Sequence, residues 1–204
     1  MYHVIHCDKH TERENHIEDL NSLLGTKINI FRGYCPDSYE WVSDVDPDLK
    51  RCHTFDSFGH LGCYLSHHML VKSLLGTKEG YSVIFEDDVT FEPGFHEEIL
   101  KICEAAPPFD MILLGNYIHP TTYNQGDHVR DNIYHMNPKQ DCYGTHALLV
   151  NNKSIEKIYN LNKTMDSHID NKYVTHIKKG DLIGYVICPP LCRQGDYGSH
   201  TIYS

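Results

Sequence analysis

The sequence predicts an α/β fold in a single domain of residues 1–204, with a mostly parallel central sheet flanked by helices. Short apolar segments alternate with stretches whose apolar residues recur at helical spacing, a pattern typical of parallel sheets covered on both faces. The length suffices for one sizeable hydrophobic core. No internal repeat, low-complexity tract or linker divides the chain, so we expect one domain.

The first elements are a strand at residues 2–7, a helix at residues 12–24 that Gly25 ends, and a second strand at residues 27–31. Residues 34–58 are rich in Asp, Pro and Ser and predict a long loop. Long loops in compact domains are often functional, so this segment is expected to contribute to a site.

The next elements are a helix at residues 59–75, where Leu61, Leu65 and Met69 form one apolar stripe, and a buried strand at residues 81–85. A second buried strand is expected at residues 110–115. The remaining segments predict helices at 94–105, 153–161 and 167–177, and strands at 132–136, 146–150 and 182–188.

Charge and composition exclude several classes of function. The formal net charge is −10, from 18 Lys and Arg against 28 Asp and Glu, and no basic cluster is present, so we expect no nucleic-acid partner. The N-terminal segment has no long apolar stretch, so we expect no membrane span, a cytoplasmic location and reduced thiols for the eight cysteines. Sixteen histidines predict sensitivity to acid.

The strongest local signal is the acidic run Glu86-Asp87-Asp88, directly after the apolar segment VIF. Three carboxylates at the end of a buried strand are costly unless a cation meets them, although a solvated acidic turn is the simpler alternative. Glu86 and Asp88 project to the same side of an extended chain, at the strand end where ligands bind in parallel sheets. Their oxygens suit Mn²⁺ or Mg²⁺.

Glycine-rich phosphate-binding loops are missing from the sequence: it has neither G-x-G-x-x-G nor G-x-x-x-x-G-K-[ST]. An acidic protein that binds a diphosphate without such loops needs a divalent cation to neutralise it. The acidic run is the place where the sequence could hold that cation.

Five segments, in order, resemble glycosyltransferase family 25, the group of lipooligosaccharide and procollagen galactosyltransferases. They are VIHCDKHTERE, GHLGCYLSHHMLVK, VIFEDDVTF, FDMILLGN, and CYGTHALLV followed by HID. The sequence departs from the family pattern in having His6-Cys7 in the first segment and His200 near the end.

This resemblance implies a domain of the GT-A type that transfers a sugar, galactose or glucose, from a UDP-sugar with inversion. The acceptor would be a glycan, a glycolipid or a hydroxylated protein. The implied metal ligands are Asp88, Glu86 and His200. The implied donor-binding residues are Asp8, Arg13, Ser66, His67, Glu86 and Asp87. Asp170 is the expected general base and Asp166, one helical turn earlier, the reserve.

Two alternatives stay open at this stage. The chain could be an inactive relative that still binds a sugar nucleotide, since a fold does not guarantee an activity. It could also be a small interaction module stabilised by zinc, with ligands drawn from the N-terminal set His3, His6, Cys7 and His10 and the C-terminal pair Cys188 and Cys192. Metal content and donor turnover separate these readings.

Overall fold

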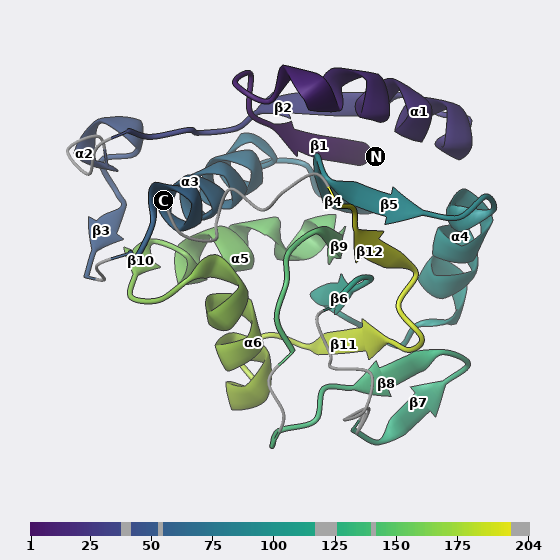
Figure 1. Ribbon diagram of the computed structural model, residues 1–204. Coiled ribbons are helices and arrows are strands. Elements are labelled where there is room, and N and C mark those ends of the chain that lie inside the picture. The colour runs from purple at the N-terminus through teal and green to yellow at the C-terminus, as the bar shows by residue number, and fades with distance from the viewer. Residues whose placement is uncertain (38–41, 53–54, 117–125, 140–141, 197–204) are drawn as a thin grey trace.

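A computed structural model describes residues 1–37, 42–52, 55–116, 126–139 and 142–196. Its centre is an eight-stranded sheet in the order β2-β1-β4-β9-β6-β11-β8-β7 (Figure 1). Helices cover both faces of this sheet, so the predicted α/β class is confirmed.

One edge of the sheet is parallel. Strand β1 (Tyr2–His6) lies between β2 (Ile28–Arg32) and β4 (Tyr81–Glu86) and pairs in parallel with both. Helix α1 (Glu14–Leu24) follows a single 3-10 turn (Thr11–Arg13) and crosses back from β1 to β2. It ends at Gly25, which adopts the left-handed conformation (φ 61°) that glycine tolerates best. The carboxyl ends of these three strands therefore meet at one edge.

The rest of the sheet is mixed in direction. Strand β9 (Ala147–Asn151) lies antiparallel between β4 and β6 (Met111–Leu113). Strand β11 (Gly184–Ile187) then pairs in parallel with β6. The last two strands, β8 (Ile133–His135) and β7 (His128–Arg130), add antiparallel pairings. Most strands still share one direction, but β9 reverses it in the middle of the sheet.

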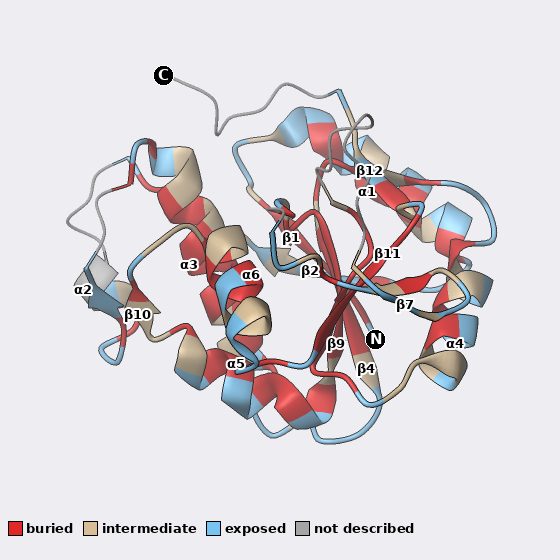
Figure 2. Cartoon of the chain, turned by 90° about the horizontal axis from the view of Figure 1, so that it is seen from below, coloured by how far each residue is buried: buried red, intermediate tan, exposed pale blue. Residues whose placement is uncertain are grey.

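Two apolar cores lie on opposite faces of the sheet (Figure 2). One core packs against α3 (Phe58–Ser73), α5 (Ile155–Leu161) and α6 (Ile169–Lys179). The other packs against α1 and α4 (Phe95–Ala105). Strand β4 contributes Ile84 to the first core and Val83 and Phe85 to the second, as alternation along a strand requires.

The segment predicted as a long loop contains α2 (Val42–Val45) and β3 (Lys50–Arg51). Asp46, which is fully buried, anchors it to the core. Its carboxylate accepts hydrogen bonds from His68 Nε2 (2.8 Å) and Tyr159 Oη (3.2 Å) and pairs with Lys72 Nζ (3.0 Å). These contacts outweigh the cost of burial and lower the pKa of Asp46 well below its usual range.

Two short strand pairs were not predicted from the sequence. Strand β3 pairs with β10 (Thr164–Met165), and β5 (Val89–Phe91) pairs with β12 (Cys192–Gln194). The second pair matters for the site because it brings the C-terminal part of the described chain beside the acidic run. Among the described residues, no helix has the length and apolar character needed to cross a membrane.

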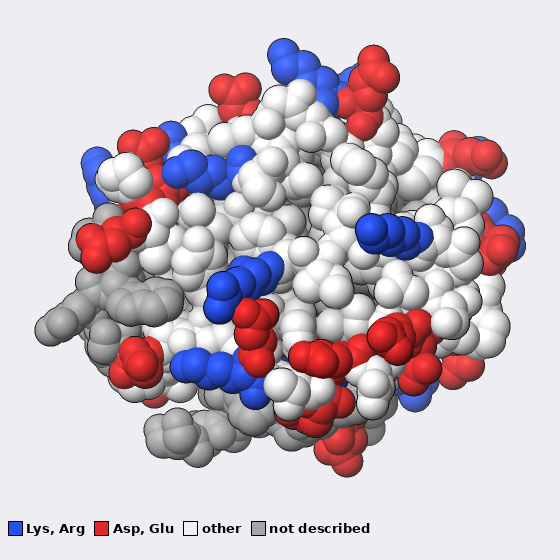
Figure 3. All heavy atoms as spheres, turned by 90° about the horizontal axis from the view of Figure 1, so that it is seen from above, with Lys and Arg blue, Asp and Glu red and all other residues white. Residues whose placement is uncertain are grey.

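Charged side chains are mixed on the surface. On the face shown in Figure 3, Lys and Arg stand among uncharged and acidic residues and form no continuous basic tract. This agrees with the acidic net charge of −10 and does not favour a polyanionic partner on this face.

Candidate functional site

A cavity of about 400 Å³ lies at the carboxyl ends of β1, β2 and β4. Its walls come from residues 7–13 after β1, residues 33–37 after β2, the first turns of α3, the acidic run after β4, and Gln194 from β12. The site therefore lies at the strand ends where ligands bind in open α/β sheets.

Six of the residues expected in a site line this cavity: Arg13, Ser66, His67, Glu86, Asp87 and Asp88. They come from three segments that are distant in sequence. Asp8, Asp166 and Asp170 do not line the cavity. His200 lies outside the described residues.

Asp87 lines the cavity, but both of its carboxylate oxygens are bonded to neighbouring groups. Its carboxylate accepts a hydrogen bond from Arg13 through one oxygen, and bonds His6 Nδ1 (2.8 Å) and the amide of Cys7 (3.4 Å) through the other. Both Asp87 and Arg13 are 5% exposed. Asp87 thus ties the end of β4 to the end of β1, and its role is to build the site.

Asp88 keeps one oxygen for a ligand. Its Oδ2 accepts a hydrogen bond from Gln194 Nε2 (2.7 Å) and lies 3.6 Å from the Arg13 guanidinium. Its Oδ1 is buried and has no hydrogen-bond partner in the described part of the chain. Burial and the nearby charge of Glu86 raise the pKa of Asp88 to about 6. A buried carboxylate with an unpaired oxygen is stabilised when a cation binds to it.

Glu86 is the centre of a second polar group. Its Oε1 accepts hydrogen bonds from Thr145 Oγ1 (2.5 Å) and Cys63 Sγ (3.6 Å) and lies 3.1 Å from His67 Nε2. Burial opposes ionisation of Glu86, but the bonds from His67 and Thr145 outweigh it and lower its pKa. All these contacts fall on Oε1. Among the described residues Oε2 has no hydrogen-bond partner, so its lone pairs are available to a ligand.

Cys63 has the properties of a buried thiol, as the sequence predicts. Burial and the charge of Glu86 raise its pKa well above the usual value. It therefore stays protonated and donates to Glu86 rather than acting as a nucleophile.

Ser66 shapes the cavity wall. Its hydroxyl donates to the carbonyl of Gly62 (2.6 Å) and accepts from the amide of Tyr34 (2.8 Å). Helix α3 thereby holds the segment after β2 in place. Gly62 allows the close approach, because a Cβ at this position would lie 2.5 Å from the Tyr34 carbonyl oxygen.

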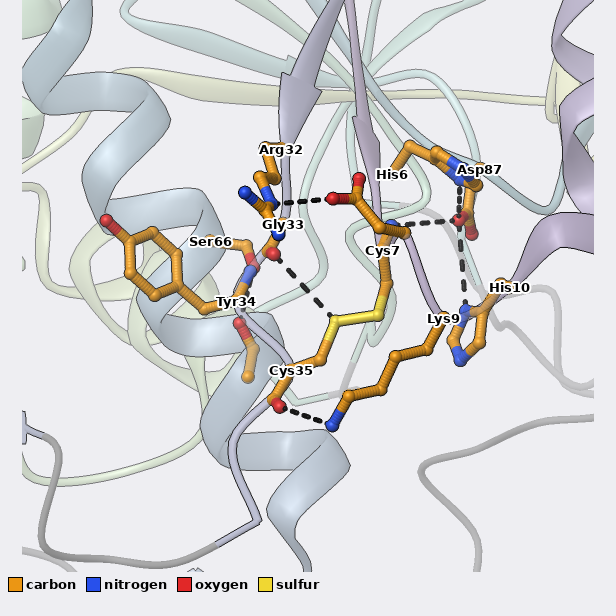
Figure 4. Close-up of a disulfide and its surroundings, with 12 residues drawn as sticks. His6, Cys7, Lys9, His10, Arg32, Gly33, Tyr34, Cys35, Ser66 and Asp87 are labelled. Carbon is orange, nitrogen blue, oxygen red and sulfur yellow. Dashed lines mark hydrogen bonds and ion pairs between the residues drawn. A yellow bond between two sulfur atoms is a disulfide. The ribbon is translucent and has the colours of Figure 1, made fainter.

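A disulfide joins Cys7 and Cys35, both of which line the cavity (Figure 4). Their Cα atoms are 6.3 Å apart, and Lys9 Nζ donates to the Cys35 carbonyl (3.1 Å) beside the bond. The expectation that all thiols are reduced is wrong for this pair, because the two strand ends bring distant cysteines together. The other six cysteines form no disulfide in the part of the chain that the structure describes.

The zinc-module alternative is not supported by this geometry. The sulfur of Cys7 is bonded to Cys35, and His6 is engaged by Asp87. The groups of His, Cys, Asp and Glu that approach one another closely in the described chain include neither Cys188 nor Cys192. The N-terminal histidines and the C-terminal cysteines therefore serve different parts of the fold.

Three expected site residues lie outside the cavity. Asp8 is more than half exposed and pairs with Arg32 Nε (2.7 Å). Asp166 precedes helix α6 instead of lying one turn earlier within it, and it pairs with Lys172 Nζ (2.7 Å). Asp170 lies in the first turn of α6, where its carboxylate accepts from the amides of Asn171 (2.7 Å) and Gly144 (3.4 Å). After burial and Glu86, its charge makes a smaller contribution to the raised pKa of the cavity residue Cys63.

Sequence patterns did not indicate Gln194, Thr145 or His6 as partners of the acidic run. Gln194 reaches Asp88 because β12 pairs with β5, and these three-residue strands carry no recognisable local pattern. Thr145 stands in the segment CYGTHALLV that resembles family 25, but nothing in its spacing indicates Glu86.

The carboxylates fit a divalent cation of the Mn²⁺ or Mg²⁺ type. Asp88 Oδ1 and Glu86 Oε2 are oxygens without protein partners among the described residues, in one cavity. Hard oxygen donors of this kind are the ligands such cations prefer. Asp87 fits less well, because Arg13 and His6 already occupy its two oxygens.

Comparison with known proteins shows which family the chain resembles. The sequence profile of glycosyltransferase family 25 (LPS biosynthesis protein) matches residues 1–175. A Bos taurus protein named probable inactive glycosyltransferase 25 family member 3 is 26% identical over 161 residues, which are 70% of this chain and 26% of the bovine protein. An Aedes aegypti glycosyltransferase 25 family member is 24% identical over 127 residues, which are 55% of this chain and 20% of that protein.

The chain thus spans about a quarter or less of the length of these two relatives. A solved structure, the apo form of the glycosyltransferase GlyE from Streptococcus pneumoniae TIGR4, is similar with a TM-score of 0.45 and 11% identity. The match covers 90% of this chain and 44% of that one. Since the family profile extends over residues 1–175 of 204, the chain belongs to glycosyltransferase family 25.

Proposed function

We propose that this chain transfers a hexose, galactose or glucose, from a UDP-sugar to an acceptor hydroxyl with inversion, in a reaction that depends on Mn²⁺ or Mg²⁺. The observation that carries the proposal is the buried Asp88 Oδ1, which has no partner among the described residues and lies in a cavity at the strand ends. Family membership supports the reaction class.

The walls of the cavity suit a nucleoside diphosphate. Lys9, His10 and Arg13 line it together with the carboxylates of Glu86 and Asp88. Asp88 and Glu86 would hold the divalent cation, and when bound that cation would stabilise the charge that develops on the diphosphate leaving group. Arg13 is ion-paired with Asp87 and lies 3.6 Å from Asp88 Oδ2, so it would position these carboxylates beside the diphosphate.

An inverting transfer needs a base that takes the proton of the acceptor hydroxyl on the side opposite the leaving group. Asp170 is the proposed base. Its charge acts on Cys63 at the cavity wall, and its carboxylate forms no ion pair in the described structure. Asp166 is less suited, because Lys172 neutralises it.

The acceptor is proposed as a glycan, a glycolipid or a hydroxylated protein, and the cytoplasmic location stays a prediction. A second candidate function is binding of a sugar nucleotide without turnover. The name of the bovine relative, a probable inactive member, favours keeping this candidate.

The test separates binding from turnover. The purified chain is titrated with UDP and incubated with a panel of UDP-sugars, with Mn²⁺ or with chelator, while release of UDP is followed. We expect binding and slow Mn²⁺-dependent release from one donor, both lost in Asp88→Asn and kept in Glu92→Gln, an exposed carboxylate directly after strand β5. Binding without release identifies the inactive relative. The absence of both binding and release would refute the proposed function.

A further inference from the structure

A cluster of two histidines and one carboxylate lies outside the cavity, where helices α3 and α6 begin. Asp56 directly precedes Ser57, the N-cap of α3, and His60 lies in the first turn of that helix. His168 is the N-cap residue of α6. The three side chains offer one donor atom each within 4.8 Å of one another.

Both imidazoles turn a ring nitrogen toward the same carboxylate oxygen. His60 Nδ1 lies 2.6 Å from Asp56 Oδ1, and His168 Nε2 lies 3.3 Å from it. The two rings stack with their centroids 4.3 Å apart and an interplanar angle of 21°. Two imidazoles that face one carboxylate in this way bring three ligand atoms within 4.8 Å of one another.

We infer that Asp56, His60 and His168 form a binding site for a first-row divalent transition cation such as Zn²⁺. The site does not rest on the proposed function. Two histidines and one carboxylate are a recurring ligand set for such cations and leave further coordination positions open. Imidazole nitrogen makes the set poorer for Mg²⁺, which prefers oxygen, so it differs in metal preference from the carboxylates of the cavity.

The spacing is close to that of a bound cation. Ligands about 2.1 Å from a tetrahedral zinc ion lie roughly 3.4 Å apart. The separation of Asp56 and His168 (3.3 Å) already matches, and that of Asp56 and His60 (2.6 Å) needs to open by less than 1 Å. Asp56 can make this adjustment because its side chain is 63% exposed.

The surrounding structure holds the rings in place. Phe55, which is 2% exposed, stacks on His168 with centroids 5.6 Å apart, and a cation would replace Ser57 Oγ, which lies 3.0 Å from His60 Nδ1. The two histidines remain about a quarter exposed, so a cation has a path from solvent. The helix N-termini disfavour a cation, but this effect is screened at such exposed positions and Asp56 opposes it.

A bound cation would join the beginning of α3 to the beginning of α6. The first turn of α3 also provides Phe58 and Gly59 to the cavity wall. The expected consequence is a cation-dependent rise in thermal stability, because binding to the folded state alone stabilises it.

The experiment uses the full chain carrying Asp88→Asn, which weakens cation binding in the cavity, after treatment with chelator; binding that remains at Glu86 would be equal in all the variants below. Titration with ZnCl₂ is followed by calorimetry and by thermal unfolding. We expect one equivalent of Zn²⁺ to bind with a Kd in the micromolar range and to raise Tm. His168→Ala and Asp56→Asn should each weaken binding by about 100-fold, whereas His128→Ala, which removes an exposed histidine on β7, should not.

Asp56→Asn keeps the inference testable if His168→Ala fails to fold, since Asp56 is largely exposed. Stoichiometric Zn²⁺ binding that is equal in all variants would overturn the inference, as would the absence of one-equivalent binding in the parent. Equal loss in His128→Ala would also overturn it, because binding would then belong to surface histidines in general.

Discussion

Replacing Gly62 by alanine tests whether helix α3 and the segment after β2 form the cavity wall together. A Cβ at Gly62 would lie 2.5 Å from the carbonyl oxygen of Tyr34 and 3.0 Å from Cδ of Pro36. Carbon and carbonyl oxygen normally approach to about 3.3 Å, so the Tyr34 carbonyl must retreat by roughly 0.8 Å. Both Tyr34 and Pro36 line the cavity, so this displacement changes its shape.

Two opposing effects decide whether Gly62→Ala raises or lowers the free energy of unfolding. Alanine in place of a helical glycine normally stabilises by about 0.5–1 kcal/mol. Forcing an extra carbon into a packed contact costs about 1–3 kcal/mol. The net result is a loss of about 0–2.5 kcal/mol, which for a chain of this size lowers Tm by up to roughly 10 °C.

Thermal unfolding and titration with UDP measure the two effects on Gly62→Ala. Ser22→Ala, a small exposed position in α1, is the matched control and should change neither UDP affinity nor Tm by much. A Gly62→Ala protein with a higher Tm and unchanged UDP affinity would show that the contact with Tyr34 does not shape the site.

Three further outcomes are expected. Asp46→Asn should lower the free energy of unfolding by about 3–5 kcal/mol in urea titrations, because the buried partners of Asp46 lose its charge; a loss below about 1 kcal/mol would contradict this. Burial lowers the pKa of His3 to about 4 and that of His68 below its usual 6.5, so stability should be complete above pH 6.5 and fall as the pH drops below it. A Tm that stays constant between pH 7 and 5 would show that these histidines do not control acid stability. Denatured protein should titrate as six thiols before reduction and eight after, and reduction of Cys7–Cys35, which are 28 residues apart, should cost about 3.6 kcal/mol; eight thiols without reductant would disprove the disulfide.

The sequence predicted the long, strongly patterned elements well. The helix expected at residues 59–75 is Phe58–Ser73, and the strand expected at 81–85 is Tyr81–Glu86. These elements bury apolar residues at regular spacing, so local pattern and tertiary packing agree. The pair β5 and β12 was missed because three-residue strands depend on a partner that is remote in sequence.

The candidate site was predicted only in part, because some of its residues depend on contacts between remote segments. Glu86 and Asp88 were indicated by their place at the end of a buried strand, and both line the cavity. Asp8 was not placed correctly, since one residue along a turning backbone decides whether a side chain faces the cavity or solvent. The sequence could not show that Asp87 supports the site while Asp88 can bind a ligand. That difference depends on the positions of His6 beside Asp87 and of Gln194 beside Asp88.

The reversed strand β9 has a consequence for how the chain is made. On each side of it lie strands of the sheet centre, β4 and β6, which are synthesised earlier and do not pair with each other in the sheet. Until Ala147–Asn151 has emerged from the ribosome, both strands keep an apolar edge without a neighbour. Such edges template association between chains. A nascent chain that stalls before β9 is therefore the form of this protein most exposed to aggregation, and completion of one five-residue strand closes both edges together.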